Sequence, residues 1–160
     1  MRNYTFRRLT HDDLPLMRRW LDAAHVKVWW PNAEKQIALM RQDMDNTGID
    51  MWIVGMMDQP FGYLHDHDAQ SFGLPQYADL PRGTRVIATF VGDAAFIGLG
   101  YTVGYIEEHV RDLRVRHTMV AAAPNATDTR SVSIYTQAGF KKRRLAPTRE
   151  GRLLQVMTHH

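Results

Sequence analysis

A loop with two glycines, between a predicted strand and a predicted helix, is the first segment of this sequence that could do chemistry. The strand covers residues 85–92, and the loop before the helix reads Ile97-Gly98-Leu99-Gly100-Tyr101-Thr102. Glycines at a helix start let backbone N–H groups point into a small concavity, where the helix dipole attracts an anion. The loop can therefore seat a pyrophosphate, or it can be a tight turn without a ligand. It is not a Walker A loop, because no Gly-Lys-Ser/Thr sequence follows.

A second segment is a predicted helix over residues 128–138. Asp128, Ser131 and Tyr135 are spaced three and four residues apart, so their side chains lie near one face of this helix. Gly139 ends the helix and leads into the next predicted strand. The pattern therefore predicts a carboxylate, a hydroxyl and a phenol on one helix face.

A third segment lies at the end of another predicted strand and reads His65-Asp66-His67-Asp68. Alternation along a strand sends the two histidines to one face and the two aspartates to the other. A histidine near an ordinary pKa of about 6.5 suits a general base, and an aspartate facing a cleft would attract a cationic amine. The same residues can instead be solvated or paired structurally. No metal site is predicted, because side chains on opposite faces cannot converge without a bulge.

Two adjacent tryptophans, Trp29 and Trp30, follow the first predicted helices. They could form a wall of an acceptor site by stacking on a sugar or by covering a thioester. Aromatic side chains at this spacing can equally belong to the core, so both interpretations stay open.

The charge pattern gives little support for a nucleic-acid partner. The net charge is +3, and basic residues are spread along the chain except for Lys141, Lys142, Arg143 and Arg144. This run could meet phosphate, but it also fits the solvated face and entry of a strand. We therefore predict no nucleic-acid partner.

The composition is typical of one folded domain. The chain has 160 residues, of which 44% are hydrophobic and 23% charged, and we predict a single domain over residues 1–160. No apolar run approaches the ~18 residues of a membrane span, and residues 1–8 lack the apolar segment of a secretory signal. Cysteine is absent, which excludes disulfides and thiolate chemistry. We expect a cytoplasmic protein without a membrane partner.

The elements that must position these segments follow from apolar periodicity, turns and caps. Strands are predicted over residues 4–9, 51–57, 62–68, 85–92, 118–122, 140–145 and 153–158. Helices are predicted from Asp12 or Asp13 through Leu21, as a short piece over 25–30, over 34–46, around Val103 to Leu113, and over 128–138. Asp58-Gln59-Pro60 is predicted as a hairpin turn, and 69–82 as a long functional loop. This order predicts an α/β layout with a mixed sheet.

Several motifs together resemble one family along nearly the whole chain. A helix with a polar start and Tyr135, followed by Ala138-Gly139-Phe140 entering a strand, resembles the closing motif of the GNAT acetyltransferases. The upstream glycine loop resembles their cofactor motif. Further similarities are Trp29-Trp30, Pro60-Phe61-Gly62-Tyr63, residues 78–83 and Phe90-Val91-Gly92. Their order resembles the aminoglycoside 6'-N-acetyltransferase-like and siderophore-acyltransferase-like branch.

The resemblance implies a fold, a co-substrate and a reaction. The fold is α/β (α+β), with a mixed central sheet of six or seven strands, splayed between the central strands and flanked by about four helices. The implied reaction transfers an acetyl group from acetyl-CoA to a primary amine of a small polar, aminoglycoside-like acceptor by direct attack. The implied cofactor-binding residues are Thr89, Phe90, Val91, Ile97, Gly98, Leu99, Gly100, Tyr101, Thr102, Asp128, Ser131 and Tyr135.

The resemblance also implies catalytic roles. Tyr135 matches the family's tyrosine and would donate a proton to the leaving sulfur, while a backbone N–H of the central strand would hold the oxyanion. An amine is mostly protonated near neutrality, so a base must take a proton first. His65 and Asp66 are the candidates for this base. The candidates for contacting the acceptor are Trp29, Trp30, Tyr63, His67 and Asp68.

Five positions depart from residues common in the family, and one of them is Asp128, which stands in place of an asparagine at the helix start and puts a negative charge near the cofactor. Leu99 and Thr102 replace a basic residue and a third glycine, and alanines at positions 88 and 123 replace two aspartates. Backbone N–H donors survive at the loop, although a lost phosphate contact removes about 1.5 to 3 kcal/mol. The alternatives are therefore a catalytically impaired relative that binds a ligand or partner, and a siderophore-type N-acyltransferase. Both a monomer and a homodimer fit the sequence.

Overall fold

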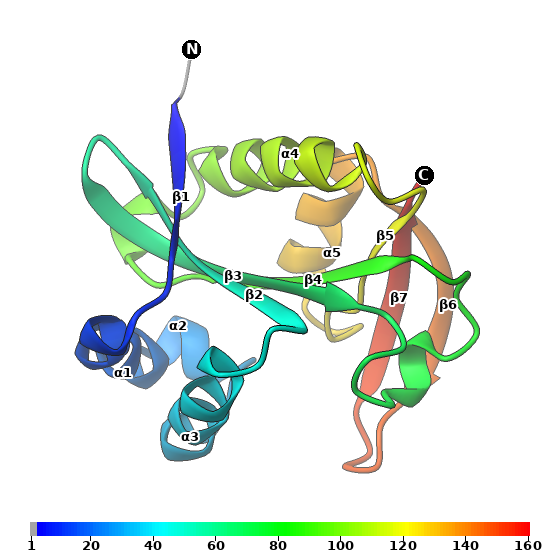
Figure 1. The fold of residues 1–160 in the computed structure, drawn as a ribbon, viewed down its shortest axis with the longest axis horizontal. Helices are drawn as coiled ribbons and strands as arrows, with labels where there is room; N and C mark the ends of the chain where they lie inside the picture. Colours follow the sequence, from blue (N-terminus) through cyan, green and yellow to red (C-terminus); the bar gives the residue numbers. More distant parts are fainter. Residues whose placement is uncertain (1–2) are drawn as a thin grey trace. The chain divides into compact units, whose positions relative to one another are not determined.

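The computed structural model describes residues 3–160, and its strands form one seven-stranded sheet with the order β1-β2-β3-β4-β5-β7-β6 (Figure 1). The strands are β1 Tyr4–Arg8, β2 Ile49–Met56, β3 Gln59–Asp68, β4 Arg85–Val91, β5 Val120–Ala122, β6 Lys141–Pro147 and β7 Leu153–His159. The sheet is mixed, because β4 and β5 are parallel whereas β1 and β2, β5 and β7, and β6 and β7 are antiparallel.

Five α-helices accompany the sheet: α1 Leu14–Asp22, α2 Ala24–Lys27, α3 Ala33–Met44, α4 Tyr101–Leu113 and α5 Thr129–Gln137. Three short 3-10 helices are η1 His11–Asp13, η2 Pro75–Tyr77 and η3 Ala94–Phe96. These elements confirm the predicted α/β class with a mixed sheet. None of the helices in residues 3–160 has the length and apolar character of a membrane span.

The chain divides into two compact units, and the unit boundaries cut strands β3 and β4. Unit 1 comprises Met1–His65 and Thr89–Leu99, and unit 2 comprises Asp66–Ala88 and Gly100–His160. The predicted single domain over residues 1–160 stays a prediction.

In unit 1, helix α1 packs its apolar face into the core. Leu14, Met17 and Leu21 recur at helical spacing and are all buried, which is the periodicity that predicted this helix. Pro15 lies in the first turn, where its missing N–H costs no hydrogen bond. Asp13, just before the helix, accepts hydrogen bonds from the Arg7 guanidinium and the Thr10 amide.

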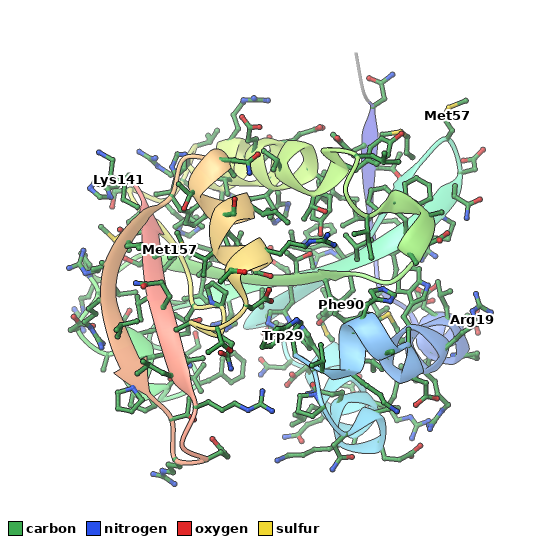
Figure 2. The ribbon with its side chains drawn as sticks, turned by 180° about the vertical axis from the view of Figure 1, so that it is seen from behind. Arg19, Trp29, Met57, Phe90, Lys141 and Met157 are labelled. Carbon is green, nitrogen blue, oxygen red and sulfur yellow. The ribbon has the colours of Figure 1, made fainter. Side chains whose placement is uncertain are left out.

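The hairpin between β2 and β3 turns at other residues than predicted. Met57 and Asp58 both have positive φ, 51° and 65°, which is the two-residue turn that matches the twist of adjoining strands. Strand β3 begins at Gln59, so Pro60 lies near a strand start, where a missing N–H is tolerated. The expected turn at residues 58–60 was therefore wrong by about one residue. Met57 stands at the hairpin tip with an exposed side chain (Figure 2).

In unit 2, β4 and β5 are joined at the pairs Arg85↔Val120 and Val86↔Ala121. The remainder of β4 continues beyond the last of these pairs. The predicted splay between the two central strands stays a prediction.

The loop over residues 69–82 is attached to β6 by one arginine. The Arg144 guanidinium donates to both carboxylate oxygens of Asp79, at 2.9 and 3.2 Å, and to the Gln76 carbonyl at 3.0 Å. The preceding residues 141–143 of the basic run are exposed. Lys141 stands at the start of β6 (Figure 2). Arg144 therefore has a structural role that the sequence did not indicate.

Candidate active site

The carboxyl end of β4 is fixed by contacts within unit 1. The His25 Nε2 nitrogen lies 3.0 Å from the Val91 carbonyl oxygen. The amide of Gly92 donates to the Phe61 carbonyl at 2.8 Å. The peptide group between Val91 and Gly92 is therefore held at its oxygen and at its nitrogen. His25 was not predicted as a site residue, because its partner lies 66 residues away in sequence.

The three predicted pantetheine-binding residues of β4 do not face one edge. The Arg85 amide donates to the Met119 carbonyl, so strand alternation directs the backbone groups of Thr89 and Val91 toward this same edge of β4. The backbone of Phe90 faces the other edge. The Phe90 side chain is buried, with its ring centroid 5.0 Å from that of Trp30.

Trp30, Tyr63 and His65 form an aromatic group in unit 1. The centroid of Trp30 lies 6.1 Å from Tyr63 and 6.0 Å from His65, with edge-to-face geometry. The Tyr63 hydroxyl and His65 Nδ1 form a 2.8 Å hydrogen bond, as expected for residues on the same face of a strand. Trp30 thus packs partly into the core. Trp29 is also partly exposed but makes no ring contact with any described residue (Figure 2).

Asp66 is the most enclosed member of the His-Asp run. Its side chain is 2% exposed, and its two carboxylate oxygens accept hydrogen bonds from Arg85 Nε at 2.7 Å and from His109 Nε2 at 2.8 Å. Arg85 also donates to the Asp66 carbonyl. These contacts support the structural interpretation of Asp66, and its predicted role as a base stays a prediction.

The next two residues of the run also contact nearby protein groups. His67 is buried, and its Nδ1 donates to the Asp68 carbonyl at 2.8 Å, while its ring lies edge-on to Phe72. The Asp68 carboxylate accepts a 2.9 Å hydrogen bond from the Gln70 amide. Local hydrogen bonds of this kind shape the strand end and the following turn. The predicted acceptor contacts of His67 and Asp68 stay predictions.

The glycine loop is open at the position predicted for a pyrophosphate. Gly98 and Gly100 have φ of 79° and 80°, and a Cβ placed on Gly98 would meet no atom within 4 Å. Leu99 is 54% exposed, so its side chain does not plug the turn. Helix α4 begins directly after these glycines, and the positive end of its dipole favours an anion there. These residues therefore fit an anionic group, and Ile97 before them is partly buried.

The polar face of α5 is used in part for capping. The Asp128 carboxylate accepts from the Ser131 amide at 3.2 Å and from the Ser131 hydroxyl at 2.7 Å. The predicted proximity of these two residues is confirmed, and it explains where the helix starts.

Tyr135, one helical turn beyond Ser131, is buried against Phe140 with a centroid distance of 5.2 Å. Its hydroxyl forms no hydrogen bond with any described residue. Burial is the main reason that its pKa is raised above the usual value, and the negative forms of Tyr105, Tyr77 and Asp128 act in the same direction. Tyr135 is therefore a neutral phenol with an unused donor, which is the state required to meet a ligand.

Within residues 3–160, no group of three or more histidine or acidic side chains has an arrangement that could hold a metal ion. The groups that could carry chemistry are histidines and backbone amides in unit 1 and the buried Tyr135 in unit 2.

The strand order, the open glycine turn and the tyrosine helix are features that the resemblance to the GNAT acetyltransferases implied. The chain belongs to the acetyltransferase (GNAT) domain family, which it matches over residues 10–147. This match confirms the predicted family, the enzyme class of N-acetyltransferase and its acetyl-CoA co-substrate.

Known proteins of this class are similar over nearly the whole chain. Aminoglycoside N(6')-acetyltransferase type 1 of Klebsiella pneumoniae is 22% identical over 157 residues, covering 92% of this chain and 78% of that protein. The structure of AAC(6')-Ib with ribostamycin and coenzyme A has a TM-score of 0.87 at 21% identity, covering 98% of this chain and 93% of that one. Spermidine N-acetyltransferase from Vibrio cholerae, with CoA and spermine, has a TM-score of 0.74 at 11% identity, with coverages of 97% and 94%. At these identities the structural likeness establishes the fold alone.

Proposed function

We propose that this chain transfers the acetyl group of acetyl-CoA to a primary amine of a small, polar, aminoglycoside-like acceptor by direct attack of the amine. The observation that carries the proposal is the open turn at Gly98, because it offers an anion seat directly before α4 within the family match. The similar proteins reported above are named for acetylation of aminoglycosides and of spermidine, which supports an amine acceptor.

The backbone supplies most of the proposed cofactor contacts. Backbone amides of the turn that begins at Gly98 bind the diphosphate, whereas the Ile97 amide already donates to the Ala94 carbonyl at 3.2 Å and leaves Ile97 only a packing contact. The backbone of Thr89, Phe90 and Val91 binds the pantetheine arm. Thr89 and Val91 are the stronger candidates, because strand alternation turns Phe90 toward the other edge. Asp128 and Ser131 cap α5 and thereby fix the helix that carries Tyr135.

Tyr135 acts on the leaving sulfur as a hydrogen-bond donor. A thiol has an ordinary pKa of about 8.5, and the raised pKa of Tyr135 lies above the tyrosine value of about 10. Complete proton transfer from Tyr135 to a thiolate is therefore uphill by more than about 2 kcal/mol. A hydrogen bond to the developing negative charge avoids this cost.

The acceptor is proposed to meet residues of the amino-terminal half. Trp29, Trp30 and Tyr63 would cover it, and His65, His67 and Asp68 would contact its polar groups. A catalytically impaired relative is the second candidate, because Asp66 is engaged by Arg85 and His109 and alanine stands at position 88. A siderophore-type acyltransfer is the third.

The remaining parts of the proposal concern organisation. We propose one domain over residues 1–160, acting in the cytoplasm on a small molecule without a nucleic-acid or membrane partner. A monomer and a homodimer are both compatible with it.

A thermal-shift titration with CoA and acetyl-CoA tests binding, because a ligand that binds only the native state raises the unfolding midpoint by mass action. Thiol release is then measured with acetyl-CoA and a panel containing aminoglycosides, polyamines and hydroxylamines. Binding with turnover of a primary amine supports the enzyme, and binding without turnover supports the impaired relative. No shift at millimolar CoA or acetyl-CoA would contradict the proposal.

A further inference from the structure

We propose that His25 is the general base of this acetyl transfer and that its Nδ1 nitrogen takes the proton of the acceptor amine. The proposal rests on the proposed function, and it names a residue that none of the sequence motifs contains. It starts from the contact between His25 and Val91 at the end of β4.

This contact fixes the tautomer of the His25 ring. A carbonyl oxygen can only accept a hydrogen bond, so His25 Nε2 carries the proton in the 3.0 Å contact with Val91. In the neutral ring the lone pair is then on Nδ1. A base that is oriented by a second group through its other nitrogen is the arrangement found in catalytic histidines.

The Nδ1 nitrogen is left available to a ligand. Within residues 3–160, Val91 is the only hydrogen-bond partner of the His25 ring, which is half-buried rather than enclosed. The charged groups nearest along the elements around it are Asp22 on α1, Lys27 on α2 and Asp93 after β4. None of these three forms an ion pair with His25 among the described contacts.

The other candidate bases are already engaged. Asp66 is bonded to Arg85 and His109, and His67 donates to the Asp68 carbonyl. His65 shares its Nδ1 with the Tyr63 hydroxyl. His25 is therefore the histidine whose ring is oriented by β4, the strand proposed to bind the pantetheine arm.

The location of His25 within unit 1 also agrees with a role as the general base. Val91 belongs to the backbone segment proposed for the pantetheine arm, and Trp29 and Trp30, proposed for the acceptor, follow His25 by four and five residues. His25 thus lies in the same short stretch of chain as Trp29 and Trp30, and its ring contacts β4, the strand proposed to bind the pantetheine arm.

The proposed step balances in atoms and charge. His25 Nδ1 takes one proton from the ammonium and later releases it to water. The freed nitrogen lone pair attacks the thioester carbonyl, so a C–N bond forms and the C–S bond breaks. The sulfur leaves with the bonding electron pair and receives the second proton of the nitrogen. The products are an amide and a thiol.

The decisive variant is His25→Gln. A glutamine amide can still donate to the Val91 carbonyl but cannot accept a proton, so it separates positioning from proton transfer. We expect kcat to fall by about 100-fold, in the range for general-base catalysis, and the acid limb of the kcat/KM profile to disappear. The thermal shift caused by CoA should be unchanged.

A matched control is His117→Gln. His117 Nδ1 also contacts a backbone carbonyl, that of Gly83 at 3.0 Å, but it lies outside the proposed site. We expect this variant to keep the kcat and the pH profile of the unaltered chain.

The outcomes of these experiments distinguish failure of the proposed acetyl transfer from failure of the proposed role of His25. If the unaltered chain releases no thiol with any amine, the proposed function fails and the role of His25 fails with it. If the unaltered chain is active and His25→Gln keeps its kcat and acid limb, His25 is not the base and the proposed function stands. If His25→Gln is active and only His25→Ala is slow, His25 is a positioning residue and the proposal is overturned.

Discussion

Trp20 lies directly over Gly92, the residue that follows β4. A Cβ placed on Gly92 would come within 2.0 Å of the indole Cδ2 and 2.2 Å of Cγ. Both residues belong to unit 1, and Trp20 is buried in its core. Only a residue without a side chain allows this approach of α1 to the strand end.

Gly92→Ala is therefore expected to destabilise the protein. The added methyl group must displace the rigid indole, and overpacking of this kind costs about 1 to 3 kcal/mol. Urea unfolding of both proteins measures the difference. A double-mutant cycle with Trp20→Leu provides the control, because removal of the indole should relieve the clash and make the two effects non-additive. Additive effects would contradict the close contact.

Asp66→Asn is expected to lower the free energy of unfolding by about 3 to 5 kcal/mol, because it leaves Arg85 without its buried counter-charge. Chemical denaturation measures this loss. Asp68→Asn is the matched control, since Asp68 is half-buried and accepts one hydrogen bond from a backbone amide; its cost should be about 1 kcal/mol. Unchanged stability together with lost activity would instead make Asp66 a catalytic base.

The contact between Asp13 and Arg7 should make the free energy of unfolding depend on pH. Hydrogen bonds from the Arg7 guanidinium are the main reason that the pKa of Asp13 lies below its usual value of about 3.9. A depressed pKa in the folded protein stabilises it above the unfolded-state pKa, and this stabilisation disappears as the pH falls through the folded-state pKa. Asp13→Asn should therefore lower stability at pH 7 by about 1.5 kcal/mol, a low value because Arg7 is 53% exposed.

The difference between the unaltered chain and Asp13→Asn should shrink as the pH falls below about 4 and the carboxylate becomes protonated. Urea midpoints at pH 7 and at pH 3 or below measure it. A difference that stays constant over this range would mean that the carboxylate charge contributes nothing.

Local signals in the sequence were sufficient for the elements of the fold. Leu14, Met17 and Leu21 indicated α1 through their spacing alone, and Gly139 marked the end of α5 through its cap position. The hairpin turn was misplaced, because no propensity indicates that Met57 adopts a positive φ. That conformation is imposed by the pairing of the adjoining strands.

The candidate site was less predictable, because its polar contacts join residues far apart in sequence. The partners of Asp66 lie 19 and 43 residues away, so the His-Asp run could not reveal that this carboxylate is buried and paired. The contact of His25 with Val91 spans 66 residues. The open turn at Gly98 was predictable, since it depends on glycines that are adjacent in the chain.

Leu99→Arg is expected to lower the KM for acetyl-CoA by about 5-fold, because an exposed guanidinium at the glycine turn can pair with a phosphate for about 1 kcal/mol. Without cofactor, the same cation near the start of α4 should lower the unfolding midpoint slightly, since it opposes the helix dipole. The thermal shift caused by CoA should therefore grow. Leu99→Ala is the control and should leave KM within 2-fold. An unchanged KM in Leu99→Arg would place the phosphates elsewhere.

Tyr135→Phe tests the role of the buried phenol in turnover. The variant removes one hydroxyl that has no described protein partner, so the core around Phe140 should remain intact and stability should change little. We expect kcat to fall by about 10- to 100-fold through loss of a hydrogen bond to the leaving sulfur, while KM for acetyl-CoA changes less than 3-fold.

Thioesters with leaving groups of lower pKa provide the sharpest readout for Tyr135. A more stable thiolate needs less help from a hydrogen-bond donor, so the deficit of Tyr135→Phe should shrink as the thiol pKa falls. The rate of the unaltered chain should also show no alkaline limb from Tyr135 below about pH 10, because burial raises its pKa above the usual value. An equal deficit with every thioester would mean that the phenol orients the cofactor and does not act on the sulfur.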